Sequence, residues 1–165
     1  MPEYAVTLDP RVRLVLAVSE GTPAAGWPIT AALYLERLSG TGRWSNYTDN
    51  SWSITVDGQE LEGSGTYDLR GTVPPGTTKR DLLISHVFTV AAAATTAVSG
   101  SFSDPRGNVA AGTVAATFAL SPRNRARVGV GDAWVEAEVY AGVNGIWKPA
   151  VPYAGVDDAW KPVVV

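Results

Sequence analysis

The chain has 165 residues, of which 45% are hydrophobic and 18% are charged, a composition typical of a folded globular protein rather than a disordered segment. Its formal net charge of −3 excludes the basic surface that collects nucleic acid or anionic lipid. With no cysteine and a single histidine, His86, the sequence offers no disulfide, no cysteine-ligated zinc and no metal or haem motif that needs two histidines.

The sequence contains no targeting signal. Met1-Pro2-Glu3-Tyr4 does not begin the basic and then apolar pattern of a secretory signal. No run of about 18 apolar residues predicts a membrane-spanning helix. We therefore expect a protein that is made in a cytoplasm and kept or assembled there.

Along the chain the dominant hydrophobic period is two, which predicts β-strands rather than helices. Clusters of Gly, Pro and Asp separate the apolar runs, and Asp57-Gly58 is a strong signal for a hairpin turn. Gly100 weakens its strand or marks a bulge in it. Roughly seven short strands with this spacing predict an all-β, antiparallel sandwich of the immunoglobulin-like (Ig-like) kind over residues 1–121. The predicted strands are residues 12–18, 29–38, 52–56, 59–62, 82–90, 98–102 and 114–120.

His86 is the first candidate for chemistry. It has the same parity as Leu82, Ile84, Phe88 and Val90, so we expect it on the apolar face of its strand, in the core or at its rim. No serine, cysteine or carboxylate motif accompanies it as a catalytic partner. We therefore predict no catalytic residue, no cofactor and no metal site, and a protein that is not an enzyme.

Residues 122–165 are predicted to form an appendage. It begins with a short basic linker that has arginines at 123, 125 and 127, and a tandem repeat of 13 residues follows from Gly131 onward. The repeat places Trp134, Trp147 and Trp160 in phase, and likewise Tyr140 and Tyr153. We expect Trp134 and Tyr140 on one face of a single strand, and Val143-Asn144-Gly145-Ile146 as a turn into the next. Pro149 and Pro152 restrict the second unit to an edge strand or a polyproline-like segment.

An appendage of 44 residues is too small to enclose three indole rings without a partner. We therefore predict that Trp134, Tyr140, Trp147, Tyr153 and Trp160 form an interface with sister copies or other proteins, as in a homo-oligomer. Burial against the sandwich or against a ligand remains an alternative.

Four other groups of residues have simple explanations. Glu136 and Glu138 share a strand face, but no second carboxylate at a suitable separation can be named, so adjacent exposed glutamates explain them better than a glycosidase pair. Asp157-Asp158 offers too few oxygens for a cation and reads as a turn. Asn46-Tyr47-Thr48 matches a glycosylation sequon without an export signal. The three linker arginines favour intersubunit ion pairs or a solvated linker over phosphate contacts.

Three aromatic residues, Trp44, Tyr47 and Trp52, lie close together in the sequence. They could form an exposed platform on which a sugar ring stacks. Packing in the core or at an interface is the favoured alternative for the same residues.

Several segments of the chain are similar to one family of proteins. In residues 10–122 these are RVRLVLAVSE, residues 44–60, Gly65-Thr66-Tyr67-Asp68, Ile84-Ser85-His86, residues 99–102 and Ser121-Pro122-Arg123. They resemble minor structural proteins from the tail tip of long-tailed bacteriophages of Gram-positive and actinobacterial hosts. The Trp-Lys-Pro and Tyr-Ala-Gly-Val-Asn-Gly repeats resemble those at the ends of actinophage tail proteins. The resemblance implies an Ig-like sandwich used as a building or adhesion module of the virion, without a cofactor or a reaction.

Two functions of different class follow from the sequence. The first is a structural virion protein, a minor tail protein that packs on other tail subunits and on sister copies. The second is a binding module that holds host cell-wall carbohydrate through aromatic stacking. A capsid decoration protein is a further alternative, because similar modules serve on many virion surfaces and a fold does not determine a function.

Overall fold

The computed structural model describes residues 1–21, 26–91 and 94–121 in full, and only the backbone of six further strands between residues 125 and 162. The chain divides into two compact units, Met1–Ser121 and Pro122–Val165. Among the described residues, no helix is long and apolar enough to cross a membrane. The strands of the first unit are β1 (Glu3–Asp9), β2 (Val12–Glu20), β3 (Trp27–Arg37), β4 (Gly40–Thr41), β5 (Trp44–Val56), β6 (Gln59–Asp68), β7 (Thr72–Val73), β8 (Lys79–Val90), β9 (Thr95–Ser103) and β10 (Gly112–Ala119).

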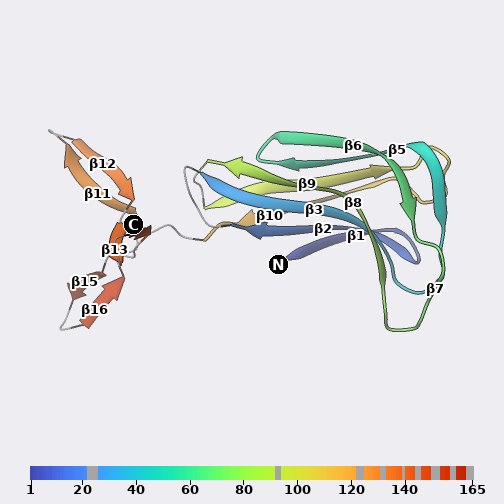
Figure 1. Cartoon of the computed structure of the whole chain (residues 1–165), viewed down its shortest axis with the longest axis horizontal. Coiled ribbons are helices and arrows are strands. Elements are labelled where there is room, and N and C mark those ends of the chain that lie inside the picture. Colours follow the sequence, from blue (N-terminus) through green and yellow to red (C-terminus); the bar gives the residue numbers. More distant parts are fainter. Residues whose placement is uncertain are drawn as a thin grey trace. The chain divides into compact units, whose positions relative to one another are not determined.

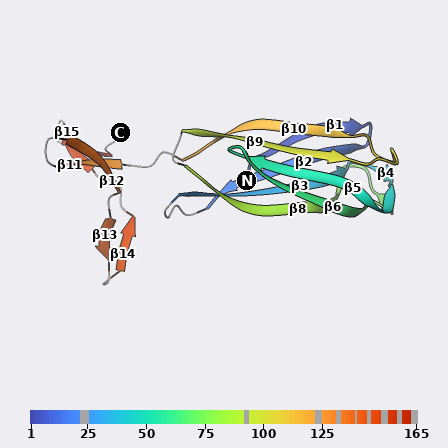
Figure 2. The same cartoon turned by 90° about the horizontal axis from the view of Figure 1, so that it is seen from above.

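Eight of these strands form two antiparallel sheets that lie face to face (Figure 1). The order in one sheet is β1-β2-β3-β8 and in the other β10-β9-β5-β6, while β4 and β7 make a separate short ladder. Across the two layers β1 and β2 lie opposite β10, β3 lies opposite β5, and β8 lies opposite β5 and β6 (Figure 2). The all-β, antiparallel part of the predicted fold is therefore confirmed.

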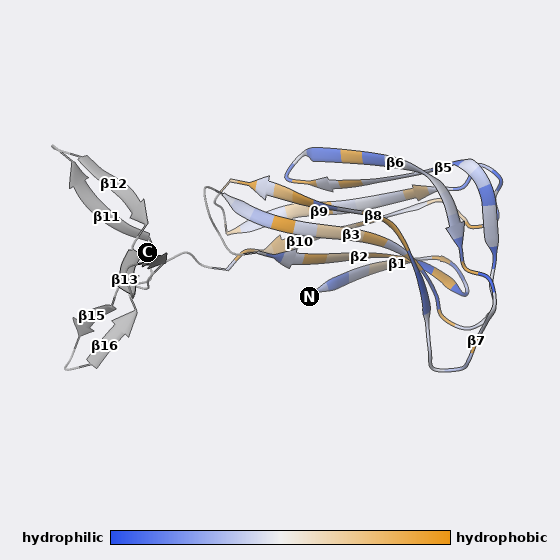
Figure 3. Ribbon diagram, viewed as in Figure 1, coloured by the Kyte–Doolittle hydropathy of each residue, from blue (hydrophilic) through white to orange (hydrophobic). Residues whose placement is uncertain are grey.

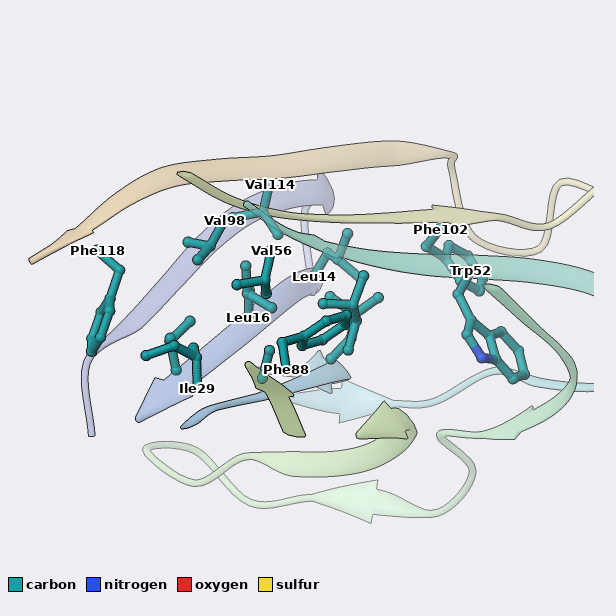
Figure 4. Packing of buried hydrophobic residues seen from close by; sticks show 14 of the residues in the cluster. Leu14, Leu16, Ile29, Trp52, Val56, Phe88, Val98, Phe102, Val114 and Phe118 are labelled. Atoms are coloured by element: carbon teal, nitrogen blue, oxygen red, sulfur yellow. The ribbon is translucent and has the colours of Figure 1, made fainter. Parts of the chain in front are cut away.

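The hydrophobic core lies between the two sheets because apolar side chains alternate with polar ones along the strands (Figure 3). Leu14, Leu16 and Ile29 from the first sheet point toward Val56 and Val98 from the second (Figure 4). All five side chains are buried. Burial of this alternating set holds each strand in its register, since a slip of one residue would turn every apolar side chain outward.

The predicted hairpin at Asp57-Gly58 is confirmed. Val56 pairs with Gln59 across a two-residue turn, and both turn residues have positive φ, 51° at Asp57 and 75° at Gly58. That geometry matches the twist of antiparallel strands and suits Asp and Gly. β1 is not among the predicted strands, although its Tyr4, Val6 and Leu8 alternate in the sequence and pack against the core.

The expected face of residues 82–90 is wrong in part. The pairing of β3 with β8 shifts between Leu33 and Tyr34, so one extra residue of β8 lies in a bulge. As a result Leu82 points out of the sandwich and is 53% exposed. His86 keeps the parity of Phe88, but its side chain is exposed and not in the core. Its ring meets Phe88 edge-on, with 4.9 Å between ring centroids.

Gly100 does not mark a bulge. It pairs in regular register with Ile54 on one side and Val114 on the other. Its inner face is occupied by Leu33 from the opposite sheet, whose Cδ1 would overlap any Cβ placed on Gly100. The glycine is therefore a packing requirement between the two sheets.

The second unit consists of three two-stranded hairpins. They are β11 (Arg125–Val130) with β12 (Ala133–Glu138), β13 (Tyr140–Val143) with β14 (Ile146–Pro149), and β15 (Tyr153–Val156) with β16 (Ala159–Pro162). In each hairpin a glycine pairs with the tryptophan: Gly129 with Trp134, Gly142 with Trp147, and Gly155 with Trp160.

This pairing corrects two expectations for the second unit. Trp134 and Tyr140 do not share a strand, because β12 ends at Glu138 and β13 begins at Tyr140. Arg125 and Arg127 belong to β11 rather than to a linker, and they pair in register with Glu138 and Glu136. The register therefore places a basic residue opposite an acidic one at both positions.

Candidate functional site

Two aromatic side chains, Trp44 and Tyr47, lie exposed near the start of β5. Trp44 is 43% exposed and Tyr47 is 45% exposed. Each ring has an arginine over it: the Arg70 guanidinium carbon lies 4.6 Å from the Trp44 ring centroid, and that of Arg106 lies 4.5 Å from Tyr47. Such cation–π contacts orient a ring and cover one of its faces.

Trp52 does not join them. It is only 7% exposed and belongs to the core, where Figure 4 shows it beside Phe102. The three residues therefore do not share an exposed platform, which was the less favoured alternative, since Trp52 points inward from β5 while the other two rings are exposed. The favoured alternative, core packing, is the one that holds for Trp52.

An irregular segment of β5 positions Tyr47. The pairing of β5 with β6 is interrupted between Ser45 and Asn50. The Asn50 amide Nδ2 fixes the segment by donating to Ser45 Oγ at 3.0 Å, to the Tyr47 carbonyl at 2.6 Å and to the Gly65 carbonyl at 2.7 Å. Because Asn50 is buried, these bonds are shielded from water and hold the projecting segment in one conformation.

The arginine over Trp44 is held by Asp68. Arg70 donates to Asp68 Oδ1 from its backbone N–H at 2.9 Å and from Nε at 3.0 Å, and its Nη2 donates to Oδ2 at 3.0 Å. These hydrogen bonds keep the pKa of the Asp68 carboxyl well below its usual range. The arginine over Tyr47 is held in turn by Asp49, whose carboxylate lies 3.6 Å from Arg106 Nε.

The turn that carries Arg106 is tied to the core through Asp104. Tyr67 donates its hydroxyl to Asp104 Oδ2 at 2.8 Å, and the Arg106 backbone N–H donates to Oδ1 at 2.9 Å. Burial, followed by the bond to Asp104, raises the pKa of Tyr67 above its ordinary value. Burial alone would raise the pKa of Asp104, but hydrogen bonds from Tyr67, the Arg106 backbone, Asn108 and the Val109 backbone together outweigh it and lower that pKa.

The outer face of the β10-β9-β5-β6 sheet carries mostly small side chains. A shallow groove of about 480 Å³ runs over it, with Glu60 and Glu62 of β6 at one side. Its hydroxyl-bearing residues are Ser51, Ser53, Ser101, Ser103 and Thr113. Ser53 and Ser101 lie opposite each other in register, with 2.9 Å between their Oγ atoms. In the sequence, this face is indicated by serines that alternate with core residues in β5 and β9.

No other described residue adds a reactive group. His86 has only its ring contact with Phe88, and no three His, Asp or Glu side chains gather as a metal site would require within the described part of the chain. Asn46 is exposed in the irregular segment of β5. Asp157-Asp158, and the side chains of Trp134, Tyr140, Trp147, Tyr153 and Trp160, lie outside the described residues.

Comparison with known proteins identifies no relative: no family model, no curated protein and no solved structure matches the chain.

Proposed function

We propose that the protein is a non-enzymatic structural subunit of a bacteriophage virion, with a minor tail protein at the tail tip as the specific role. In this proposal the first unit is an Ig-like sandwich used as a building module. The second unit docks on other virion subunits and on sister copies. Capsid decoration is the same class of function at a different position on the particle.

The strand order supports the Ig-like assignment. The chain passes from β3 in one sheet to β5 in the other, and later from β8 to β9. β3 and β8 are neighbours in the first sheet, and β5 and β9 are neighbours in the second. An immunoglobulin domain pairs its B strand with E and its C strand with F in the same way. β1 and β2 then extend the first sheet on its outer side.

The observation that carries the docking role is the pairing within the repeat. Among the described residues each hairpin pairs only with itself, in a ladder of four to six residues, and two-stranded hairpins of this kind are marginally stable in water. Three successive hairpins, each with a tryptophan, therefore need apolar surface to pack against. Burying one Trp removes about 150–250 Å² from water, roughly 4–6 kcal/mol before ordering costs.

The test is localisation on purified phage particles. Antibodies raised against residues 1–121 and coupled to gold should label the tail tip. Labelling of the head would overturn the tail position and support decoration. Particles that contain none of the protein by mass spectrometry would overturn the virion role itself.

A second candidate function, adhesion to host cell-wall carbohydrate, is favoured by the exposure of Trp44 and Tyr47. Trp44→Ala should weaken cosedimentation with host cell walls several-fold, because one stacking contact is worth on the order of 1 kcal/mol. Trp44→Phe, which keeps an aromatic ring, is the matched control and should retain most of the binding. Absence of binding by the unmodified protein would remove this candidate.

A further inference from the structure

A second recess, away from the exposed aromatic residues, is lined by three arginines. It has a volume of about 220 Å³. Its wall is formed by the turn between β1 and β2, by Arg37 at the end of β3, and by residues 41–43, which begin at the last residue of β4. The polar residues that line it are Asp9, Arg11, Arg37, Thr41 and Arg43.

Arg37 forms the buried part of this wall. It is 1% exposed, and its Nη1 donates to the Gly40 carbonyl at 2.7 Å. Its Nε and Nη2 are buried as well, and neither has a hydrogen-bond acceptor among the described residues. A guanidinium remains charged at any physiological pH, so these two donors carry a buried charge that lacks a counter-ion.

Neither Glu36 nor Asp9 accepts a hydrogen bond from Arg37 Nε or Nη2 within the described residues. Glu36 precedes it on the strand and therefore points to the other face of the sheet, where it binds Arg13 and Arg80. Asp9 lines the recess: its Oδ1 accepts the Arg11 backbone N–H at 3.0 Å, and its buried Oδ2 lies 3.3 Å from Arg43 Nη1 but makes no hydrogen bond within the described residues.

The charge of the recess is therefore unbalanced. Three guanidinium groups against one carboxylate leave an excess of two positive charges. The excess is local, because the whole chain has a net charge of −3. Arg11 and Arg43 are exposed at the rim, and Arg37 lies beneath them.

The backbone at Gly40 and Gly42 packs closely against the side chains of Arg11 and Arg37. A Cβ on Gly42 would overlap both Arg37 Nη1 and the Leu69 carbonyl oxygen. A Cβ on Gly40, which has a φ of 81°, would overlap Arg11 Nη1. The two glycines thus let the backbone pass directly against both guanidinium groups, which fixes the Arg37 side chain before any ligand arrives.

We propose that this recess binds a small oxyanion group, a carboxylate or a phosphate. Arg37 lines the recess, and its unpartnered Nε and Nη2 are two donors on one edge of the guanidinium, a pair that can bind two oxygens of such a group side by side. Arg11 and Arg43 supply further positive charge at the entrance. A volume of about 220 Å³ is below that of pockets for drug-sized ligands, so the recess suits a single charged group. This proposal does not rest on the virion or adhesion role.

The experiment is calorimetric titration of the full chain with sodium phosphate and, separately, sodium acetate, at pH 7 and constant ionic strength set with sodium chloride. Saturable binding of either anion is expected, with chloride as the reference. Phosphate binding without acetate binding would identify a phosphate site, and the reverse would identify a carboxylate site.

Three variants make the test specific. Arg37→Met should abolish saturable binding. Because Arg37 is buried and this variant could misfold, Arg11→Gln at the exposed rim is the second variant, and it should weaken binding by roughly two- to fivefold. Arg70→Gln removes the same charge outside the recess and should bind as the wild type does. The proposal is overturned if neither anion binds saturably, or if Arg37→Met and Arg11→Gln bind as tightly as Arg70→Gln.

Discussion

Glu36 is a fully buried carboxylate that two arginines satisfy from neighbouring strands. Arg13 Nε donates to its Oε1 at 2.6 Å, and Arg80 Nε donates to its Oε2. Arg80 also reaches Glu3 with two further bonds, of 2.6 and 2.7 Å, and its guanidinium lies over the Tyr34 ring. These contacts connect β1, β2, β3 and β8 across the outer face of the first sheet.

We predict that Glu36→Gln lowers the free energy of unfolding by about 2–3 kcal/mol, because two partly exposed guanidinium groups lose their buried counter-charge. Glu3→Gln is the matched control: it changes an exposed partner of the same Arg80 and should cost less than about 1 kcal/mol. Urea unfolding followed by tryptophan fluorescence measures both. Equal costs for the two variants would contradict the assigned role of burial.

A second residue-scale prediction concerns the Tyr67–Asp104 bond. Tyr67→Phe should cost about 1.5–3 kcal/mol near neutral pH, since it removes a donor from a buried carboxylate. The raised pKa of Tyr67 means that wild-type stability falls once the pH exceeds the unfolded value of about 10. The lowered pKa of Asp104 means that stability is lost as the pH falls below about 4.

The stability difference between wild type and Tyr67→Phe should therefore be largest between about pH 5 and 9 and shrink on both sides of that window. Urea unfolding at several pH values measures it. Tyr47→Phe removes a hydroxyl that makes no hydrogen bond within the described residues, so its effect should be close to zero throughout. A pH-independent difference for Tyr67→Phe would refute this linkage.

At the scale of elements, the contact between Gly100 of β9 and Leu33 of β3 joins the two sheets. Gly100→Ala should cost about 1–3 kcal/mol, because the added methyl group overlaps a fully buried leucine. Leu33→Ala alone should cost about 2–5 kcal/mol through the cavity it leaves.

The double variant should be more stable than the sum of the two single effects predicts, because the alanine at 100 fills part of that cavity. Denaturant unfolding of all four proteins in a double-mutant cycle provides the measurement. Simple additivity would show that Leu33 does not occupy the space above Gly100.

Most strands could be predicted from the sequence because one face of each sheet is buried and the period of two is therefore visible. The bulge in β8 could not, since Leu82, Leu83 and Ile84 are all apolar and offer no parity to read. A similar limit applies to the relation between Trp44 and Trp52. The irregular segment between Ser45 and Asn50 breaks the alternation, so the parity of Trp52 says nothing about Trp44.

At the scale of the whole molecule, we expect residues 1–121 to fold without the second unit. The last residues are held by the sandwich itself: Leu120 donates to the Ala94 carbonyl at 3.0 Å, and the Ser121 N–H donates to Glu20 Oε2 at 2.9 Å. Truncation after Ser121 should leave the unfolding free energy within about 0.5 kcal/mol of the full chain, since no core residue is removed.

The same truncation should lower the molar mass in multi-angle light scattering to that of a monomer, because the proposed docking surface is gone. Circular dichroism checks that the shortened chain is folded. A folded truncated protein with the oligomeric state of the full chain would refute the assembly role of the repeat.

Each candidate site is assembled from residues that are far apart in the sequence and come together only in the folded chain. The arginine recess joins residues 9–11, Arg37 and residues 41–43 at one end of the first unit. Nothing in their spacing predicts that they meet, because the meeting depends on the β1–β2 turn and on the short ladder of β4 with β7. Arg70 and Arg106, which lie over the exposed rings of Trp44 and Tyr47, likewise belong to segments far from β5 in the sequence.

The hairpins of the second unit have a consequence for how this chain can change over generations. Each tryptophan strand pairs with the glycine strand immediately before it, so the ladders of the described strands are each completed within a single hairpin. A gene duplication or deletion of one period, 13 codons long, would therefore add or remove a complete hairpin while every remaining ladder kept its register. Selection can thus change the length of the second unit by one hairpin at a time without changes to the sandwich that precedes it.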